Sequence, residues 1–323
     1  MTTLVTGATG LVGNAIVRSL IARKRSVRVL ARSVDKAKRV VPEGVEVVAG
    51  DVTDPASLRR AFAGAEVAYH AAGLPEQWLP DPRSFDRVNV AGTENVIEAT
   101  RSLGLRRLVY TSTIDVFKAG TGQEYDESEI DPAPKGTHYE RSKQEADRVV
   151  VRAEQRGLDV VFLHPAAVYG PGPAGSPGVN DFAHKLLAGE APALLPGGMP
   201  VVFSDDVGEG HVRAEERAES GARFILSERY VTLRELARCV LDAAGSDARL
   251  PFVIPLWAAR IASRLTEAWA RRSGRAPLVP AGQLTFLQWQ ARPNAARARR
   301  ELALEFTTLE DGLQRLLTAT GSD

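Results

Sequence analysis

The stretch Thr3-Leu4-Val5-Thr6-Gly7-Ala8-Thr9-Gly10-Leu11-Val12-Gly13 opens this chain of 323 residues and decides its fold. Its first four residues predict a short strand, and the run Leu11 to Arg23 predicts a helix. Glycine permits the tight turn and close backbone approach between them, and the N-terminus of the helix favours a phosphate group. The stretch therefore predicts a dinucleotide site, which we expect to be formed by Gly7, Thr9, Gly10, Leu11, Val12 and Gly13.

Strand and helix patterns alternate through the rest of the first half. We expect strands at Thr3–Thr6, Val27–Ala31, Val45–Ala49, Val67–His70, Arg107–Thr111 and Val160–Leu163. We expect helices at Leu11–Arg23, Ala56–Ala63, Phe85–Leu103 and His138–Arg156. This alternation predicts an α/β fold with a Rossmann-type, doubly wound parallel sheet, whose ligands bind at the carboxyl ends of the strands.

The pattern changes after Pro165. A Gly- and Pro-rich loop is expected at Tyr169–Pro177, followed by a helix, a strand and a second helix at Asp181–Leu187, Pro200–Phe203 and Asp206–Ala218. A buried strand at Ala222–Leu226 is expected to rejoin the main sheet, and the tail from Pro251 is mainly helical. We therefore expect a dinucleotide-binding domain at 1–167, rejoined by 205–245, and a smaller, mainly helical C-terminal substrate lobe formed by 168–204 and 246–323.

Composition narrows the partners and the compartment. A quarter of the residues are charged and the formal net charge is +1, so nothing global indicates nucleic acid. Cys239 is the only cysteine, which excludes an intrachain disulfide and fits a reducing, cytoplasmic location. We expect no signal peptide and no spanning helix, because the chain starts with a strand and no apolar run reaches about 18 residues. The five His residues lack ligand spacing, so no metal is expected; a homodimer stays open.

Tyr139-Glu140-Arg141-Ser142-Lys143 carries the chemistry. Tyr139 and Lys143 are four residues apart and share one face of a helix. A Lys ammonium beside a phenol lowers the Tyr pKa from about 10 and makes Tyr139 a candidate general acid and base. Thr113 lies 26 residues upstream at the end of an apolar strand, where its hydroxyl can join the same site.

These motifs, in this order, resemble the extended short-chain dehydrogenase/reductase family over nearly the whole chain. The branch most similar holds dihydroflavonol reductases, 3β-hydroxysteroid dehydrogenases and a hopanoid-associated sugar epimerase. The resemblance implies that Asp51 and Val52 contact the adenine of the cofactor. It also implies that the fourth strand ends at Ala71 and Ala72, which contact the cofactor as well. Asn89 matches the first residue of a motif that the family carries in its fourth helix. A role in packing at the start of that helix would explain Asn89 equally well. The loop that covers the nicotinamide matches the chain at Pro165 and Val168.

The resemblance implies a mechanism. Hydride passes between the nicotinamide and a carbonyl or carbinol carbon, and Tyr139 exchanges a proton with the substrate oxygen. Lys143 lowers the pKa of Tyr139 and hydrogen-bonds the nicotinamide ribose. Thr113 hydrogen-bonds the same substrate oxygen. A small-molecule substrate and an NAD(P) cofactor follow from this family assignment.

Arg32 points to NADP rather than NAD. An acidic residue at the end of the second strand would accept hydrogen bonds from the ribose hydroxyls of NAD and repel a 2′-phosphate. Ala31 occupies that position here, and Arg32 follows it. A guanidinium presents a fork of donors that suits a phosphate, so we expect NADP, with NAD as the weaker alternative.

Two departures favour a net redox reaction over sugar-nucleotide chemistry. Family dehydratases carry Asp and Glu directly after the catalytic Thr, whereas Thr113 is followed by Ile114 and Asp115. Sugar-nucleotide enzymes commonly have Arg where this chain has His164. We therefore expect an NADP(H)-dependent oxidoreductase that interconverts a ketone and a secondary alcohol. An NAD(P)-dependent sugar or sugar-nucleotide epimerase and a noncatalytic NADP-binding regulator are the alternatives.

The substrate is expected to be largely apolar. Residues expected to contact it are Leu74, Trp78, Ile114, His138 and Phe182, with further walls at Val168, Leu186, Trp257 and Ile261. The segment Pro255 to Arg272 has apolar residues at helical spacing with arginines among them. It suits a helix packed on the lobe, a lid over the substrate or a membrane-surface contact, and the sequence does not choose among these roles.

Overall fold

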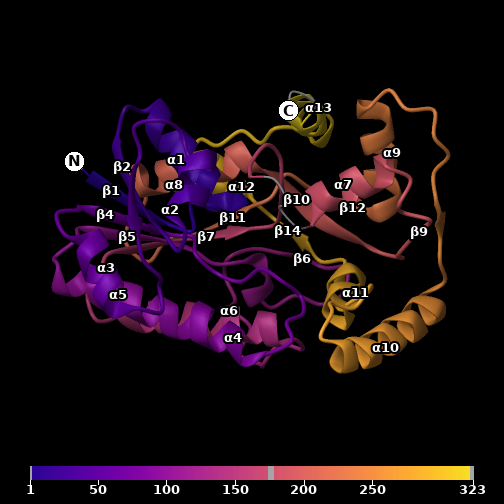
Figure 1. The fold of residues 1–323 in the computed structure, drawn as a ribbon, viewed down its shortest axis with the longest axis horizontal. Helices are drawn as coiled ribbons and strands as arrows, with labels where there is room; N and C mark the ends of the chain where they lie inside the picture. The colour runs from indigo at the N-terminus through magenta and orange to yellow at the C-terminus, as the bar shows by residue number, and fades with distance from the viewer. Residues whose placement is uncertain (1, 174–177, 321–323) are drawn as a thin grey trace.

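A seven-stranded parallel sheet forms the centre of the protein (Figure 1). The structure, a computed structural model, describes residues 2–173 and 178–320. The spatial order of the strands is β11-β7-β5-β4-β1-β2-β3, so the order reverses between β1 and β4, as a doubly wound sheet requires. The strands are β1 (Thr2–Thr6), β2 (Ser26–Ala31), β3 (Glu46–Ala49), β4 (Val67–His70), β5 (Arg107–Thr111), β7 (Val160–Pro165) and β11 (Arg223–Leu226). The predicted Rossmann-type architecture is confirmed.

Helices cover both faces of this sheet, and each face has its own hydrophobic cluster. Apolar side chains of α1, among them Ile16 and Leu20, pack with Val207 of α8 on one face. Leu58 of α3 and Val149 of α6 belong to the cluster on the other face. Both faces of the strands are therefore buried, which explains their nearly continuous apolar sequences. These helices are α1 (Leu11–Ala22), α2 (Val34–Val40), α3 (Pro55–Phe62), α5 (Gly92–Ser102), α6 (His138–Glu154) and α8 (Ser204–Arg217).

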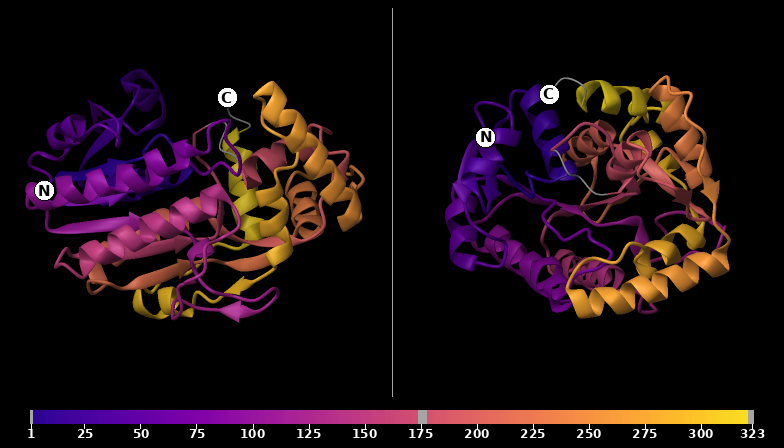
Figure 2. Two further views of the ribbon diagram at one scale, coloured as in Figure 1. Left: turned by 90° about the horizontal axis from the view of Figure 1, so that it is seen from below. Right: turned by 45° about the vertical axis from the view of Figure 1, so that its right-hand side comes forward.

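A smaller lobe lies beyond the carboxyl ends of the strands, on the right of Figure 1. Its three-stranded sheet has the order β12-β10-β8, and its own hydrophobic cluster joins this sheet to α7, α9, α11 and α13. The elements are β8 (Ala167–Tyr169), α7 (Val179–Leu187), β10 (Gly198–Phe203), β12 (Arg229–Thr232), α9 (Leu233–Ala243), α10 (Leu256–Ser273), α11 (Ala281–Trp289) and α13 (Leu309–Thr320). The right-hand view of Figure 2 brings this lobe forward and shows α10 along its lower border. None of the helices in the described ranges combines the length and apolarity needed to cross a bilayer.

The chain crosses between the two parts more often than the sequence indicated. Strand β11 pairs with β7 in parallel register, as expected for the return to the large sheet. The expected return segment, 205–245, is nevertheless split, because β12 pairs with β10 and α9 packs in the cluster of the lobe. Helix α12 (Ala296–Glu301) then returns to β11, while α13 packs in the lobe. The division into two domains remains a prediction. The segment that rejoins the large domain ends after β11, not at residue 245 as expected.

One expected helix contains an irregular turn. The predicted helix at Phe85–Leu103 is formed by α4 (Arg83–Phe85), a π-helical segment at Asp86–Ala91 and α5. A π-turn inserts an extra residue into the helical hydrogen-bond pattern and commonly marks a functional site. Here it turns Asn89 inward, where its side chain is almost fully buried.

Several short elements are absent from the sequence prediction. The two-residue strands β6 (Glu124–Tyr125), β9 (Ala193–Leu194), β13 (Phe252–Val253) and β14 (Arg292–Pro293) form two small sheets. Such short strands have no periodicity of their own and exist through pairing with a distant segment. The expected loop at Tyr169–Pro177 begins one residue later, because Tyr169 ends β8; residues 174–177 lie outside the described part.

Candidate active site

The glycine loop fits tightly against the sheet where the strand order reverses. Gly7 has φ of 77°, and a Cβ atom there would lie 2.6 Å from the backbone of Ala71 and Ala72. A Cβ atom at Gly13 would lie 2.2 Å from the carbonyl oxygen of Gly7. Only glycine fits at these two positions, and the start of α1 is thereby held against β1 and β4.

The N-terminus of α1 is open to an anion. Gly10 caps the helix without a side-chain hydrogen bond, and the first turn carries no acidic residue. The helix dipole and the free N–H groups therefore meet solvent beside Thr9, Leu11 and Val12, which are partly exposed. The glycine loop leaves space that a side chain at Gly7 or Gly13 would occupy, and the N–H groups at the start of α1 have no side-chain cap. Both features fit the pyrophosphate of a dinucleotide.

The residues expected to flank the adenosine line the same edge of the sheet. Arg32 directly follows β2, is exposed, and has no hydrogen bond or ion pair with the residues that the structure describes. The neighbouring Ser33 hydroxyl caps α2 by accepting a hydrogen bond from the Lys36 N–H. Asp51 follows β3, and its Oδ1 accepts hydrogen bonds from the N–H and the hydroxyl of Thr53, both at 2.8 Å. Val52 is buried.

Thr113, Tyr139 and Lys143 meet beyond the carboxyl end of β5. Thr113 caps a short 3₁₀ turn at Ile114–Val116, and its hydroxyl donates a hydrogen bond to Oδ2 of Asp115 at 3.1 Å. Tyr139 and Lys143 lie in the first turns of α6, which begins with a capping box between Thr137 and Glu140. Lys143 Nζ donates to the carbonyl oxygen of Thr111 at 3.0 Å.

The acidity of Tyr139 differs from the sequence expectation. Burial raises the pKa of Tyr139 above its ordinary value, and the charge of Asp115 acts in the same direction, while the contact with Thr113 lowers it. Lys143 is turned toward β5, and burial lowers its own pKa to about 8. The expectation that Lys143 lowers the pKa of Tyr139 is therefore not met in this structure, because desolvation of the phenol outweighs any attraction.

Asp115 is the main acidic group that the sequence analysis passed over. Its side chain is 7% exposed, and Oδ1 has no hydrogen-bond partner among the described residues. Burial, assisted by the charge of Glu140, raises the pKa of Asp115 to about 7. The only signal in the sequence is an acidic residue two positions after Thr113, a position considered there only for dehydration chemistry.

Asn89 organises the wall beside Tyr139. Its Oδ1 accepts a hydrogen bond from the Leu74 N–H at 2.8 Å, and its Nδ2 donates to the Ser142 hydroxyl at 2.9 Å. One amide side chain thus joins the loop after β4 to α6. The contacts favour the structural role that the sequence left open for this residue.

A buried polar network supports the strand end that carries Thr113. The Ser112 hydroxyl donates to Asp147 at 2.8 Å, and Arg223 forms an ion pair with the same carboxylate at 3.0 Å. His164 contacts both Arg223 and the carbonyl oxygen of Thr113, and burial lowers the pKa of His164 to about 3. His164 is therefore an uncharged member of this network at neutral pH. No three His, Cys, Asp or Glu side chains of the described ranges form a metal-binding group.

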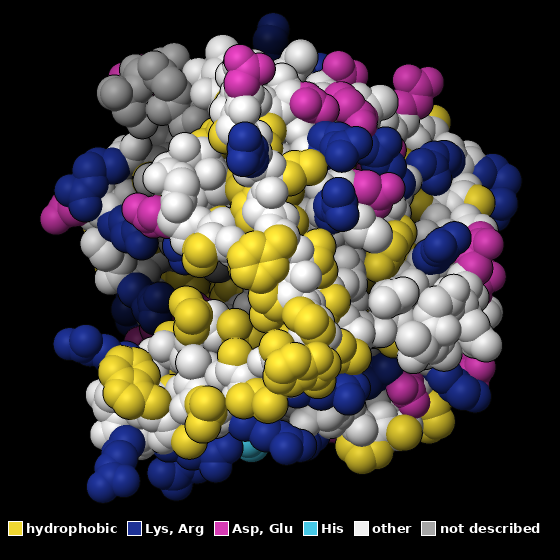
Figure 3. All heavy atoms as spheres, turned by 90° about the vertical axis from the view of Figure 1, so that its right-hand side faces the viewer, with side chains coloured by type: hydrophobic (Ala, Val, Ile, Leu, Met, Phe, Trp, Pro, Cys, Tyr) yellow, Lys and Arg dark blue, Asp and Glu magenta, His cyan; other side chains and the backbone are white. Residues whose placement is uncertain are grey.

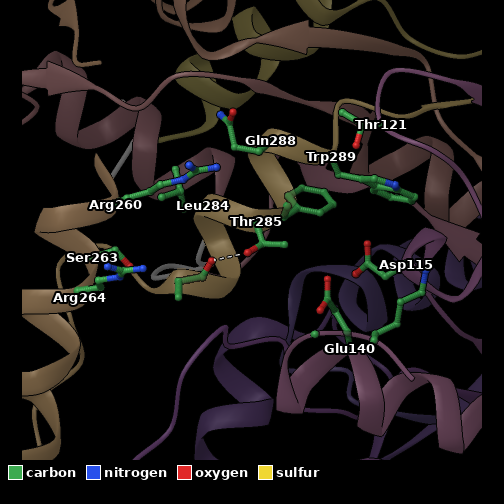
Figure 4. A pocket seen from close by; sticks show the side chains of 14 residues that line it. Asp115, Thr121, Glu140, Arg260, Ser263, Arg264, Leu284, Thr285, Gln288 and Trp289 are labelled. Carbon is green, nitrogen blue, oxygen red and sulfur yellow. Dashed lines mark hydrogen bonds between the residues drawn. The ribbon is translucent and has the colours of Figure 1, made fainter. Parts of the chain in front are cut away.

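A cavity of about 510 Å³ adjoins this cluster (Figure 4). One wall comes from Asp115 and from Glu140 at the start of α6, and the opposite wall comes from α10 and α11. The lining residues are Asp115, Thr121, Lys135, Gly136, Glu140, Arg260, Ser263, Arg264, Ala281, Leu284, Thr285, Phe286, Gln288 and Trp289. The cavity thus lies between the two parts of the molecule, next to Thr113.

The expected substrate walls do not line this cavity. Ile114 is 1% exposed and packs in the large core cluster, because the 3₁₀ turn directs it inward. Leu186 is buried in the lobe, and Trp257 and Ile261 are 67% and 52% exposed on the outside of α10. Leu74, Trp78, Val168 and Phe182 are partly buried elsewhere, and His138 is exposed at the first position of α6. Residues of α11, in particular Leu284, Phe286 and Trp289, supply the apolar wall instead.

Arginines from the tail enter the cavity. Arg260 and Arg264 lie on α10 and face the carboxylates of Asp115 and Glu140 across the cavity (Figure 4). Neither arginine has a hydrogen bond or ion pair with another residue in the described ranges. The site therefore offers two free guanidinium groups as well as an apolar wall.

The sequence and the fold both match known proteins. The profile of the NAD dependent epimerase/dehydratase family matches residues 3–226. The chain is 31% identical to sterol demethylase protein B of Methylococcus capsulatus, over 94% of this chain and 93% of that protein. It is 30% identical to a 2-alkyl-3-oxoalkanoate reductase of Stenotrophomonas maltophilia over the full length of both.

A solved structure is similar over the same extent. The UDP-glucose 4-epimerase of Thermus thermophilus, determined in complex with NAD, superimposes with a TM-score of 0.78. The two sequences are 25% identical, and the match covers 100% of this chain and 99% of the other. The similarity thus extends to both the large sheet and the smaller lobe.

Proposed function

This chain belongs to the NAD-dependent epimerase/dehydratase family, and within that family we propose that it is an NADP(H)-dependent reductase of a largely apolar ketone. It is an NAD(P)-dependent oxidoreductase of the extended short-chain dehydrogenase/reductase type, and enzymes of this family act on small molecules.

The observation that carries the proposal is the surroundings of Thr113. Its hydroxyl contacts Tyr139 and donates a hydrogen bond to Asp115, which lines the cavity, at the carboxyl edge of the sheet that also holds the glycine loop. The neighbour that would have to be an acid for water loss, Ile114, is buried in the core. This arrangement supports proton transfer to a single oxygen and leaves the position directly after Thr113 without the acid that dehydration would use.

A bound nicotinamide supplies hydride chemistry, and the residues of the chain handle the proton and the charge. Tyr139 gives its proton to the carbonyl oxygen as that oxygen becomes an alcohol, or takes it back in oxidation. Thr113 stabilises the same oxygen by a hydrogen bond, after exchanging its present acceptor, Asp115, for the substrate. Lys143 contributes positive charge next to the strand end and holds the ribose hydroxyls.

Arg32 supports the preference for NADP. It is exposed and unpartnered in the described part of the chain, directly after β2 and beside the cap of α2. A 2′-phosphate at this edge would gain a charge-assisted hydrogen bond from the guanidinium. The absence of an acid at Ala31 removes the repulsion that an NAD-specific enzyme uses against that phosphate.

The cavity supports an amphiphilic substrate. Leu284, Phe286 and Trp289 form an apolar wall, and burial of apolar area stabilises a ligand by about 25 cal/mol per Å². Arg260 and Arg264 suit an anionic group at the other end of the molecule. The named substrate of the Stenotrophomonas relative, a 2-alkyl-3-oxoalkanoate, combines a ketone, alkyl chains and a carboxylate in this way.

An epimerase acting on a sugar nucleotide is the second candidate, and the same two arginines favour it. A nucleoside diphosphate needs convergent cationic donors, which the loop after β8 lacks but which α10 supplies. The structural similarity to a UDP-glucose 4-epimerase agrees with this alternative.

A competition experiment separates the two. Uridine and thymidine diphosphate sugars are titrated against aryl, steroid-like and long-chain 3-oxoacid substrates, while the oxidation of NADPH is followed by its absorbance. We expect turnover of at least one apolar ketone, with no inhibition by the sugar nucleotides. Tight binding of a sugar nucleotide, with no turnover of any apolar carbonyl, would overturn the proposal and leave the epimerase.

Two further expectations concern the setting of the enzyme. We place it in the cytoplasm, because Cys239 is the only cysteine of the chain and a reducing compartment suits it. A homodimer stays a prediction, to be checked by light scattering of the purified protein.

A further inference from the structure

Helix α10 presents large apolar side chains to solvent. Trp257, Ile261, Leu265 and Trp269 recur every fourth residue and form one stripe, and their exposed fractions are 67%, 52%, 67% and 54%. Most other large apolar residues of the described chain are buried. A continuous stripe of this kind marks an interaction surface.

The orientation of the helix is the reverse of that in an ordinary surface helix. An amphipathic helix of a globular protein buries its large apolar residues against the core. The residues that α10 buries are small, namely Ala259, Ser263 and Ala270. The fold therefore uses the small face of α10 for internal packing and leaves the large face outside.

The segments on either side of α10 extend the exposed surface. Phe252 and Val253 precede the helix and Leu278 follows it, with exposed fractions of 67%, 38% and 85%. Figure 3 shows hydrophobic side chains gathered on this face of the molecule, with Lys and Arg side chains along the border. We call this surface, formed by the seven residues named in this and the first paragraph, the α10 apolar face.

Positive charge surrounds the α10 apolar face. Residues 251–280 contain five arginines, at 260, 264, 271, 272 and 275, and all five are exposed. The single acid of this stretch, Glu267, accepts a hydrogen bond from the Ala281 N–H of α11 at 2.8 Å with one carboxylate oxygen, and its other oxygen lies 3.8 Å from the Arg271 guanidinium. A chain whose net charge is only +1 thus concentrates positive charge beside its most apolar surface.

We propose that the α10 apolar face docks on an anionic lipid bilayer, with α10 lying in the plane of the interface. The wide tryptophan rings at the two ends of the stripe, Trp257 and Trp269, suit the boundary between headgroups and acyl chains. The apolar residues between them enter the acyl region, and Arg271, Arg272 and Arg275, which do not line the cavity, meet lipid phosphates. This inference does not depend on the proposed reaction.

Charge distinguishes the bilayer from a second copy of the chain. A two-fold symmetric contact places the same patch of both subunits face to face. The arginines around the α10 apolar face would then oppose each other, and Glu267, the one acid of residues 251–280, already pairs with Arg271 and with the backbone of α11. An anionic surface removes this conflict.

Docking would place the active-site cavity next to the lipid. Arg260, Ser263 and Arg264, which lie beside the stripe on the same helix, line that cavity. An apolar substrate dissolved in the bilayer would therefore have a short path to Thr113 and Tyr139.

Sedimentation with lipid vesicles tests the proposal on the whole purified protein. The probes are vesicles of phosphatidylcholine alone and vesicles of phosphatidylcholine with phosphatidylglycerol. We expect the wild type to sediment with the anionic vesicles and much less with the neutral ones. The double variant Trp257→Ser/Leu265→Ser should lose roughly tenfold or more in binding, because it removes two inserted side chains. Arg271→Gln/Arg272→Gln should lose binding only to the anionic vesicles.

Matched controls carry the same changes on other surfaces. Leu103 is an exposed leucine after α5, and Arg59 and Arg60 are exposed on α3. Leu103→Ser and Arg59→Gln/Arg60→Gln should bind vesicles as the wild type does. Wild-type unfolding temperatures in the α10 variants would show that the fold is intact.

Three results would overturn the proposal. The first is a wild type that does not bind anionic vesicles, and the second is a Trp257→Ser/Leu265→Ser variant that binds them as well as the wild type. The third is a wild-type dimer that this variant dissociates while neither form binds vesicles, because the face would then belong to a second copy.

Discussion

At the scale of single residues, burial sets the chemistry of the site. Tyr139, Lys143 and Asp115 are close together and mostly shielded from water, so each is displaced toward its neutral form. Asp115 and Lys143 are thereby brought near the point of losing or gaining a proton at neutral pH, whereas Tyr139 stays protonated and can act as a proton donor. Substitutions at Tyr139 and Asp115 test this account.

Tyr139→Phe should lose turnover and keep cofactor affinity. The change removes the hydroxyl that exchanges a proton and keeps the ring that packs edge-on against Phe85 at 6.3 Å between centroids. We expect kcat to fall on the order of a hundredfold or more. The measurement is steady-state turnover of the best ketone of the panel, together with NADPH binding by fluorescence.

The control for Tyr139→Phe is Tyr230→Phe, which removes a hydroxyl from β12 in the lobe. It should leave turnover within a few-fold of the wild type. Activity of Tyr139→Phe at the same level would remove Tyr139 from the mechanism.

Asp115→Asn should stabilise the protein more at pH 8 than at pH 4. The pKa of Asp115 is about 7 in the folded protein, above the value of 3.8 for an exposed carboxyl, so the folded state holds this proton more tightly than the unfolded state does. The contribution of Asp115 to stability is therefore lost as the pH rises from about 4 to about 7. The amide stays neutral, so we expect its advantage to grow over this window, to a few kcal/mol at most.

Denaturant unfolding of both proteins across that pH range measures this difference. Asp247→Asn, which changes an exposed carboxylate after α9, serves as the control and should follow the wild type. A constant difference between Asp115→Asn and the wild type from pH 4 to pH 8 would contradict the assignment.

At the scale of elements, the cofactor site depends on how closely α1 approaches β1. The contact is between backbone atoms, with Gly13 against the carbonyl of Gly7, so no side chain can adjust to relieve a clash. Helix α1 also packs against α8, which restricts its movement away from the sheet.

Gly13→Ala should therefore destabilise the fold and abolish cofactor binding. The added Cβ atom would lie 2.2 Å from the Gly7 oxygen, and overpacking of this kind costs about 1–3 kcal/mol or more. Gly10→Ala is the matched control, because its Cβ atom would lie 3.4 Å from its nearest neighbour and its φ of −97° suits alanine. Equal unfolding free energies for the two variants would show that α1 is free to shift.

At the scale of the whole molecule, the tail connects the two parts. After α10 and α11 the chain returns to the large sheet through α12 and crosses again to the lobe through α13. The cavity is lined by residues of both parts. A ligand that binds to either part is therefore expected to stabilise the folded molecule as a whole.

The unfolding temperature of the whole molecule reports cofactor preference. A ligand that binds only the folded state raises stability by an amount that depends on its concentration relative to its Kd. We expect NADPH to raise the unfolding temperature more than NADH at equal concentration. Arg32→Ala should lose the difference, because the charge-assisted hydrogen bond is worth about ten- to a hundredfold in affinity.

Arg39→Ala, which changes an exposed arginine of the following helix α2, is the control for Arg32→Ala and should keep the wild-type preference. An equal loss for both cofactors in Arg32→Ala, or a wild type that prefers NADH, would refute the assignment of Arg32.

The sequence alone determined the large sheet, the glycine loop and the positions of Thr113, Tyr139 and Lys143 along the chain. These features depend on local signals, because apolar periodicity, glycine spacing and a four-residue interval act within one or two elements. The bounds of β4 and β5 coincide with the expected ones for the same reason.

Only the tertiary structure decided the environment of the site and the outer surface. Desolvation of Asp115 and Tyr139, the inward position of Ile114, the return of Arg260 and Arg264 to the cavity and the outward stripe of α10 all depend on contacts between distant segments. A helical period shows that α10 has two faces, but packing selects which of them is buried. Here the buried face carries only the small residues Ala259, Ser263 and Ala270, and α10 packs against α11.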